Sequence, residues 1–291
     1  MTVGSRQLVV GSKRSALSVK DGLNFIFKFS NFQIPKFLKH IPNLFTLLNL
    51  FFGCIAIVCI LQNGITIVNN ADGSQYLDIP ERIWMASLFI GLAALVDFLD
   101  GFLARLLKQS SPLGAQLDSL ADVVSFGVAP GMIIYQFLRM SYMRQENGMD
   151  ISMIFLVPAF ILPCAAAYRL AVFNLDNSQS GSFKGIPVPA VGLTVASFPL
   201  IYWMRTNGMV LDLLLNKWVL YGVTLFLSYG MVSRYPMLSF KIAGKQDPQT
   251  LPRIILIILS ALALIFLHWL AVPLIFLFYI VISLAFKNRF T

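Results

Sequence analysis

Long apolar stretches, each close in length to a membrane-spanning helix, dominate the chain. A helix needs about 20 apolar residues to cross a bilayer, and apolar residues make up 57% of the 291 residues. Charged residues make up only 12%, against roughly 25% in soluble domains. The expected spans cover residues 41–62, 83–107, 115–138, 151–174, 188–206, 211–232, 253–268 and 270–286. The sequence therefore predicts an all-α polytopic membrane helix bundle with about eight transmembrane helices.

The positive charges gather at the ends of these stretches. When both termini are placed in the cytoplasm, all but five of the 22 Lys and Arg residues fall on the cytoplasmic side. This distribution follows the positive-inside rule and explains the net charge of +9 without nucleic-acid binding. It predicts a multi-pass protein of the cell (inner) membrane with both termini in the cytoplasm. The five exceptions are Arg82, Arg139, Arg144, Arg205 and Lys217.

Four carboxylates lie where the second apolar stretch ends and the third begins: Asp97, Asp100, Asp118 and Asp122. An isolated acid at the centre of a spanning helix costs roughly 2.5–3.5 kcal/mol, and four acids at one depth also repel one another. The spacings of three and four residues place each pair on one helix face. A short hairpin at residues 110–112 brings the two faces together. We therefore expect the four carboxylates to converge at the cytoplasmic end of the bundle.

Two simpler explanations of these acids are weaker. Location in headgroup water, or pairing with Arg105 and Lys108, accounts for one acid but not for the spacing of four. Oxygen ligands without His or Cys favour Mg²⁺ or Mn²⁺. Two such ions about 3.5–4 Å apart clamp a pyrophosphate between them. The sequence thus predicts a site for two divalent metal ions.

Small residues next to the acids leave room for a nucleotide. Gly101, Ala104 and Gly114 lack bulky side chains, and Arg105 supplies a cation for phosphate oxygens. Tight helix packing is the alternative explanation of Gly101 and Gly114.

Residues 97–122 read D-x2-D-G-x2-A-R-x8-G-x3-D-x3-D. This pattern resembles the signature of the CDP-alcohol phosphatidyltransferase family at every fixed position and in every spacer. The resemblance implies a helical membrane fold with a cytoplasmic active site and two divalent metals. It also implies direct attack of an alcohol hydroxyl on the lipid-linked phosphorus, with CMP leaving.

The resemblance also implies roles for individual residues. Asp97, Asp100 and Asp118 are metal ligands, and Asp122 is both a ligand and the general base. Contacts to the cytidine diphosphate come from Gly101, Ala104, Arg105 and Gly114. The run from Ile41 to Asn49 resembles the family's first helix, in which Asn43 and Thr46 face the nucleotide phosphates. Asn43 as the N-cap of that helix is the alternative explanation, and the two roles are compatible.

Several later blocks resemble the integral-membrane, bacterial group of CDP-diacylglycerol–serine O-phosphatidyltransferases. They follow the fourth aspartate, surround residues 168–174 and 183–190, and reach residue 245. A serine acceptor needs a cation for its carboxylate, for which Arg169 and Lys184 are candidates. Alternatively, Arg169 and Lys184 are basic residues that anchor helix ends on the cytoplasmic side of the membrane. Ser125 and Asn174 are further candidates for polar contacts to serine.

These observations divide the chain into three parts. Residues 1–40 form a basic tail with an amphipathic helix in the membrane interface, residues 41–245 the catalytic core, and residues 246–291 a C-terminal helix pair. CDP-diacylglycerol and L-serine are the expected substrates, and the resemblance suggests a homodimer. One alternative keeps the chemistry with glycerol 3-phosphate, inositol phosphate or another polyol as acceptor. The other is an ion-coupled transporter, although the chain shows neither repeated halves nor paired broken helices.

Overall fold

The computed structural model of the chain describes residues 41–62, 66–69, 75–78, 82–106, 111–144, 151–175, 183–204, 208–238 and 249–287. Pro42–Thr291 form one compact unit, distinct from Met1–Ile41. The basic tail and interfacial helix predicted over residues 1–40 lie outside the described residues. The division at residue 245 stays a prediction.

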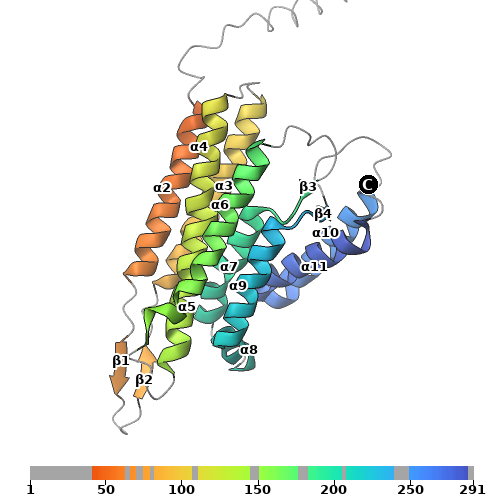
Figure 1. Ribbon diagram of the computed structural model, residues 1–291. Coiled ribbons are helices and arrows are strands. Elements are labelled where there is room, and N and C mark those ends of the chain that lie inside the picture. The colour runs from red at the N-terminus through yellow and green to blue at the C-terminus, as the bar shows by residue number, and fades with distance from the viewer. Residues whose placement is uncertain are drawn as a thin grey trace, which may run out of the picture. The chain divides into compact units, whose positions relative to one another are not determined.

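Helices form nearly all of the regular structure, so the predicted all-α bundle is confirmed (Figure 1). Within the described residues, two antiparallel ribbons of very short strands accompany them, and no sequence pattern predicted either. The first joins β1 (Thr66–Asn69) to β2 (Gln75–Asp78), and the second joins β3 (Phe183–Lys184) to β4 (Pro236–Met237). The helices are α2 (Ile41–Leu61), α3 (Ile83–Leu106), α4 (Pro112–Asp122), α5 (Ala129–Met143), α6 (Ile161–Leu175), α7 (Val188–Trp203), α8 (Gly208–Leu214), α9 (Lys217–Val232), α10 (Thr250–Leu267) and α11 (Ala271–Ala285).

Each predicted span has a helical counterpart, but fewer stretches meet the length and hydropathy expected of a spanning helix. Within the described residues five do so, or six if the bent pair α8 and α9 is one span. Two features explain the difference from eight. Helix α7 has only 16 residues, and Thr250–Ala285 counts as a single apolar stretch although it contains both α10 and α11.

Helices α4 and α5 form one long span joined by a π-helical turn, Val123–Val128. Ser111 is the N-cap of this span, and its hydroxyl accepts a hydrogen bond from the Gly114 N–H at 2.9 Å. Pro112 occupies the first turn. Such turns widen a helix locally and are frequent at functional sites. This turn carries Phe126, which is fully buried. A Cβ at Gly192 of α7 would lie 2.8 Å from the Phe126 Cβ, so glycine permits this close packing.

The last apolar stretch folds into two helices, as the sequence predicted. The chain breaks at His268, which has a positive φ of 48°, and Pro273 follows early in α11. Helices α10 and α11 pack against each other, and Figure 1 shows them side by side.

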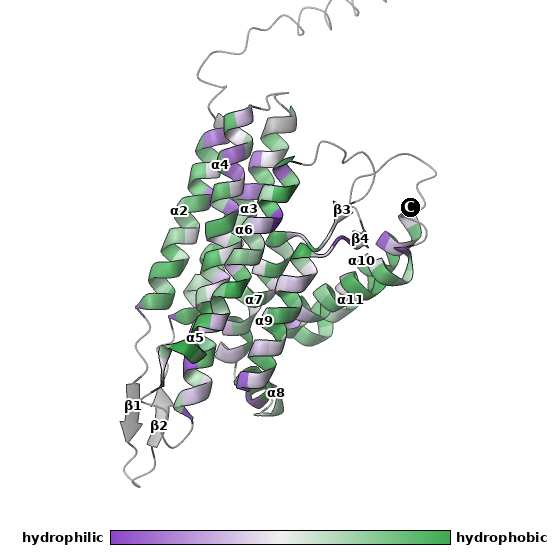
Figure 2. Cartoon of the chain, viewed as in Figure 1, coloured by the Kyte–Doolittle hydropathy of each residue, from purple (hydrophilic) through white to green (hydrophobic). Residues whose placement is uncertain are grey.

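Apolar residues cover most of the helix surfaces, as expected for helices that face lipid. Figure 2 shows this, with hydrophilic residues gathered on α3 and α4 near the end where the chain passes from one to the other. Exposed large apolar side chains include Leu44, Phe51, Leu95 and Phe98. The distribution agrees with a membrane protein whose polar site lies toward one end of the bundle.

Candidate active site

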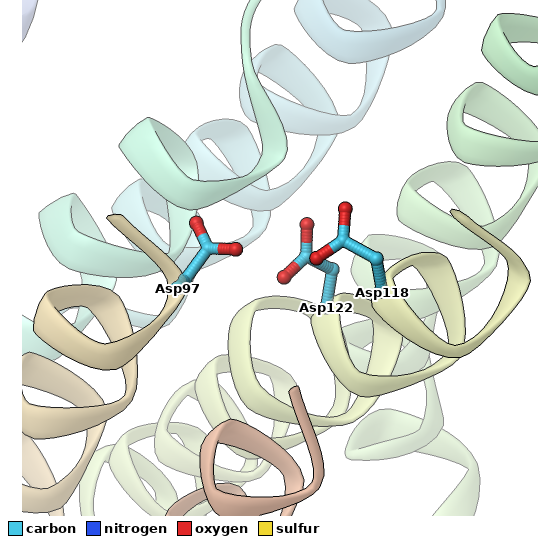
Figure 3. Close-up of side chains that lie close together, drawn as sticks. All are labelled: Asp97, Asp118 and Asp122. Carbon is cyan, nitrogen blue, oxygen red and sulfur yellow. The ribbon is translucent and has the colours of Figure 1, made fainter. Parts of the chain in front are cut away.

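Three carboxylates from two helices meet at one point of the bundle. Asp97 lies in the C-terminal half of α3, and Asp118 and Asp122 lie on α4, one turn apart (Figure 3). One carboxylate oxygen from each lies within 4.8 Å of the others. Asp122 is buried, whereas Asp97 and Asp118 are half-buried. The predicted convergence of the two helix faces is therefore present for these three acids.

The chemistry of this group fits a divalent cation. Three negative groups this close together in an apolar bundle repel one another and are costly to desolvate. Two oxygens bound to the same Mg²⁺, each at about 2.1 Å, lie at most about 4.2 Å apart. The three carboxylates thus need little movement to share one ion. All donors in the group are oxygens, which is the preference of Mg²⁺ and Mn²⁺.

Asp100, the fourth predicted ligand, is not a member of this group. Its carboxylate accepts a hydrogen bond from the Thr46 hydroxyl of α2, and both side chains are buried. The same hydroxyl lies 3.1 Å from the carbonyl oxygen of Pro42. Since a hydroxyl has one proton, Thr46 donates to one of these acceptors at a time. Metal binding by Asp100 and phosphate contact by Thr46 stay predictions.

Asn49 is a part of the site that the sequence reasoning missed. Its Nδ2 donates to Oδ1 of Asp122 at 3.2 Å, and its carbonyl oxygen accepts from the Ser125 hydroxyl at 3.0 Å. Asn49 is fully buried, and its own Oδ1 has no hydrogen-bond partner. An amide in the middle of an apolar helix is costly to bury. The position of Asn49 within an apolar stretch was therefore the signal available in the sequence.

Close packing holds α2 against the turn that follows Asp122. A Cβ at Gly53 would meet the Ser125 hydroxyl and lie 2.9 Å from the Ser125 Cα. Ser125 is buried, and its hydroxyl bonds α2. This gives Ser125 a structural contact, and its predicted contact to serine remains a prediction.

The predicted nucleotide-binding residues partly come together. A Cβ at Gly114 would lie 3.2 Å from Oδ1 of Asn43, so these two residues are neighbours. A Cβ at Gly101 would meet no heavy atom within 4 Å, so tight helix packing does not explain that glycine. Helix α2 begins at Ile41, so Asn43 lies inside the first turn and is not the N-cap. The side chains of Ala104 and Arg105 are outside the described part of the structure.

Of the predicted serine contacts, Arg169 is a buried cation. This α6 residue is 9% exposed, and its guanidinium lies within electrostatic range of Asp122 and of Tyr279 on α11. Its Nε is buried and has no hydrogen-bond partner. Asn174, on the last turn of α6, is exposed and donates to the Ser119 hydroxyl at 2.9 Å. The Lys184 side chain falls outside the described part.

These features define a polytopic helical membrane protein with a carboxylate site suited to a divalent metal. The model of the CDP-alcohol phosphatidyltransferase family matches residues 39–230, and the chain belongs to that family. The match contains all four aspartates, so the resemblance seen in the sequence is confirmed. The family consists of transferases that act on CDP-alcohols and are generally dependent on divalent metals.

Three curated relatives carry the same name, CDP-diacylglycerol–serine O-phosphatidyltransferase. The protein of Helicobacter pylori (strain ATCC 700392 / 26695) is 34% identical over 201 residues, which are 67% of this chain and 71% of the relative. That of Bacillus subtilis is 30% identical over 59% of this chain and 85% of its own length. That of Saccharomyces cerevisiae is 34% identical over 60% of this chain and 57% of its own length.

Proposed function

We propose that the protein transfers the phosphatidyl group of CDP-diacylglycerol to the hydroxyl of L-serine and releases phosphatidylserine and CMP. The observation that carries this proposal is the convergence of Asp97, Asp118 and Asp122 within the family signature. The acceptor is suggested by the relatives, all three of which are named for serine.

The carboxylate site suits direct transfer in one step. The serine hydroxyl oxygen forms a bond to the lipid-linked phosphorus while the bond from that phosphorus to the oxygen of CMP breaks. Two divalent ions, Mg²⁺ or Mn²⁺, held by the four aspartates would stabilise charge on the transferred phosphate and on the leaving CMP. Asp122 takes the proton of the attacking hydroxyl, and Asn49 holds the Asp122 carboxylate in place.

Arg169 supports serine as the acceptor. A buried guanidinium with an unpaired Nε, close to the proposed base, is suited to bind the serine carboxylate. In that position the carboxylate would keep the serine hydroxyl near Asp122. Lys184 is the second candidate cation, and Asn43, Thr46, Gly101, Ala104, Arg105 and Gly114 are the proposed contacts to the nucleotide.

The placement in the cell follows from the charge pattern. In this proposal, both termini and the carboxylate site lie on the cytoplasmic side of the inner membrane. This orientation is chosen because it places most Lys and Arg residues in the cytoplasm. The water-soluble substrate serine then reaches the site from the cytosol. A homodimer is proposed by likeness to the family alone.

Acceptor specificity is tested by product analysis. Detergent-purified protein is incubated with CDP-diacylglycerol, Mn²⁺ and, in separate reactions, serine, glycerol 3-phosphate, inositol phosphate and glycerol. The expected result is that only the reaction with serine forms a lipid product, and that it forms phosphatidylserine and CMP in equal amounts. A lipid product from another alcohol in place of serine would refute the acceptor. Absence of CMP release with every alcohol would refute the transferase assignment and reopen that of an ion-coupled transporter, which the family match disfavours.

A further inference from the structure

Helix α11 lies beyond the segment that the family model matches, yet it belongs to the same compact unit as the carboxylate site. The family match ends at residue 230, and α11 covers Ala271–Ala285. It packs against α7 and against β4. The proposed chemistry assigns no role to this helix, although its contacts lead to the candidate acceptor residues.

Two buried side chains of α11 bind both backbone groups of Leu238. The Leu238 N–H donates to the Ser283 hydroxyl at 3.2 Å, and the Tyr279 hydroxyl donates to the Leu238 carbonyl oxygen at 3.3 Å. All three residues are buried. Buried backbone groups need such partners. The pair of bonds therefore fixes the residue that directly follows β4.

Strand β4 in turn holds the segment that carries Lys184. Lys184 pairs with Pro236 and Phe183 with Met237 in the ribbon, and the Gly185 N–H donates to the Tyr235 carbonyl at 2.9 Å. Gly185 has a φ of +74°, and a Cβ there would lie 2.6 Å from the carbonyl oxygen of Ser233. This close fit means that a shift of Leu238 displaces the backbone on both sides of Lys184.

Tyr279 also interacts electrostatically with the other candidate cation. The Arg169 guanidinium is within electrostatic range of both Tyr279 and Asp122. Because the Tyr279 hydroxyl is held by its hydrogen bond to Leu238, its oxygen keeps a fixed place in the surroundings of that guanidinium. Both candidate cations are then linked to a single helix.

We propose that Tyr279 and Ser283 are positioning residues of the acceptor site, which hold Arg169 and the ribbon carrying Lys184 where the acceptor carboxylate binds. The inference rests on the proposed acceptor role of these two cations. It gives α11 a function in acceptor affinity, separate from the metal and nucleotide contacts made by α2, α3 and α4.

The variants Tyr279→Phe and Ser283→Ala test this role, because each removes one hydroxyl and keeps most of the packing. Tyr229→Phe on α9 is the matched control, since Tyr229 is 67% exposed. The KM for serine, the KM for CDP-diacylglycerol and kcat are measured for each purified protein. We expect the serine KM to rise about three- to tenfold, as for loss of one buried hydrogen bond. The KM for CDP-diacylglycerol and kcat should stay within about twofold of the wild-type values.

Two results would overturn the inference. One is a serine KM unchanged in both variants. The other is a parallel change in both KM values and kcat, which indicates general loss of packing. If one variant does not accumulate in the membrane, the other decides. If wild-type protein uses another alcohol, the KM for that alcohol is measured. A rise in that KM supports the role of α11 even though the assignment of serine fails. An unchanged KM for that alcohol refutes the role of α11.

Discussion

Replacement of Asn49 by leucine tests whether this buried amide supports Asp122 in catalysis. Leucine has the same branching and number of side-chain heavy atoms as asparagine. The change therefore removes the hydrogen bond from Nδ2 to Oδ1 of Asp122, 3.2 Å long, without leaving a cavity. A buried hydrogen bond to a charged group contributes about 1.5–3 kcal/mol. Since about 1.4 kcal/mol corresponds to a factor of ten in rate, we expect kcat to fall about 10- to 150-fold.

The matched control is Gln136→Leu. Gln136 is also a buried amide that bonds α2, because its Nε2 donates to the Ile60 carbonyl at 3.0 Å. Ile60 lies 11 residues beyond Asn49 on the same helix, or about 16 Å along its axis. The assay is CMP release at saturating CDP-diacylglycerol and serine. A fall in kcat below about threefold for Asn49→Leu, or an equal fall in both variants, would refute the catalytic role of Asn49.

Three further substitutions test other parts of the account. Asp122→Asn should lower kcat by at least about 10²-fold because the proposed base is lost, and near-normal turnover would remove that role. Arg169→Ala should raise the serine KM by about 10-fold or more and the CDP-diacylglycerol KM far less, while an unchanged serine KM would exclude contact. Gly192→Ala should destabilise the protein by about 1–3 kcal/mol, seen as a lower Tm, because its Cβ would lie 2.8 Å from Phe126. Gly222→Ala is its control, since a Cβ there meets no atom within 4 Å, and equal Tm values would contradict the packing argument.

The sequence predicted the parts of the site that depend on spacing within a helix. Asp118 and Asp122 are one turn apart on α4, and the packing of α4 near α3 places them opposite Asp97. Side-chain partners across helices were not accessible in this way. The bond of Thr46 to Asp100 depends on how α2 packs against α3, and spacing alone does not determine that packing.

The remaining differences have similar physical causes. Strand pairs of only two to four residues carry too little pattern to be predicted, which explains β3 and β4. The proposed role of α11 depends on Tyr279 and Ser283, two polar residues in an apolar stretch. Their partner Leu238 is more than 40 residues away in the sequence. The cost of burying such hydroxyl groups signals that each has a partner, and only the fold identifies it.

The most direct test of the central claim is a measurement of Mn²⁺ binding by electron paramagnetic resonance on detergent-purified protein. The variants are Asp97→Asn and Asp118→Asn, and the control is Asp212→Asn, an exposed acid on α8 paired with Arg144 at 3.2 Å. The account predicts that wild-type protein and the control bind Mn²⁺ with equal affinity, whereas both site variants lose the bound signal. Equal Mn²⁺ binding by all four proteins would contradict a metal site built from these carboxylates.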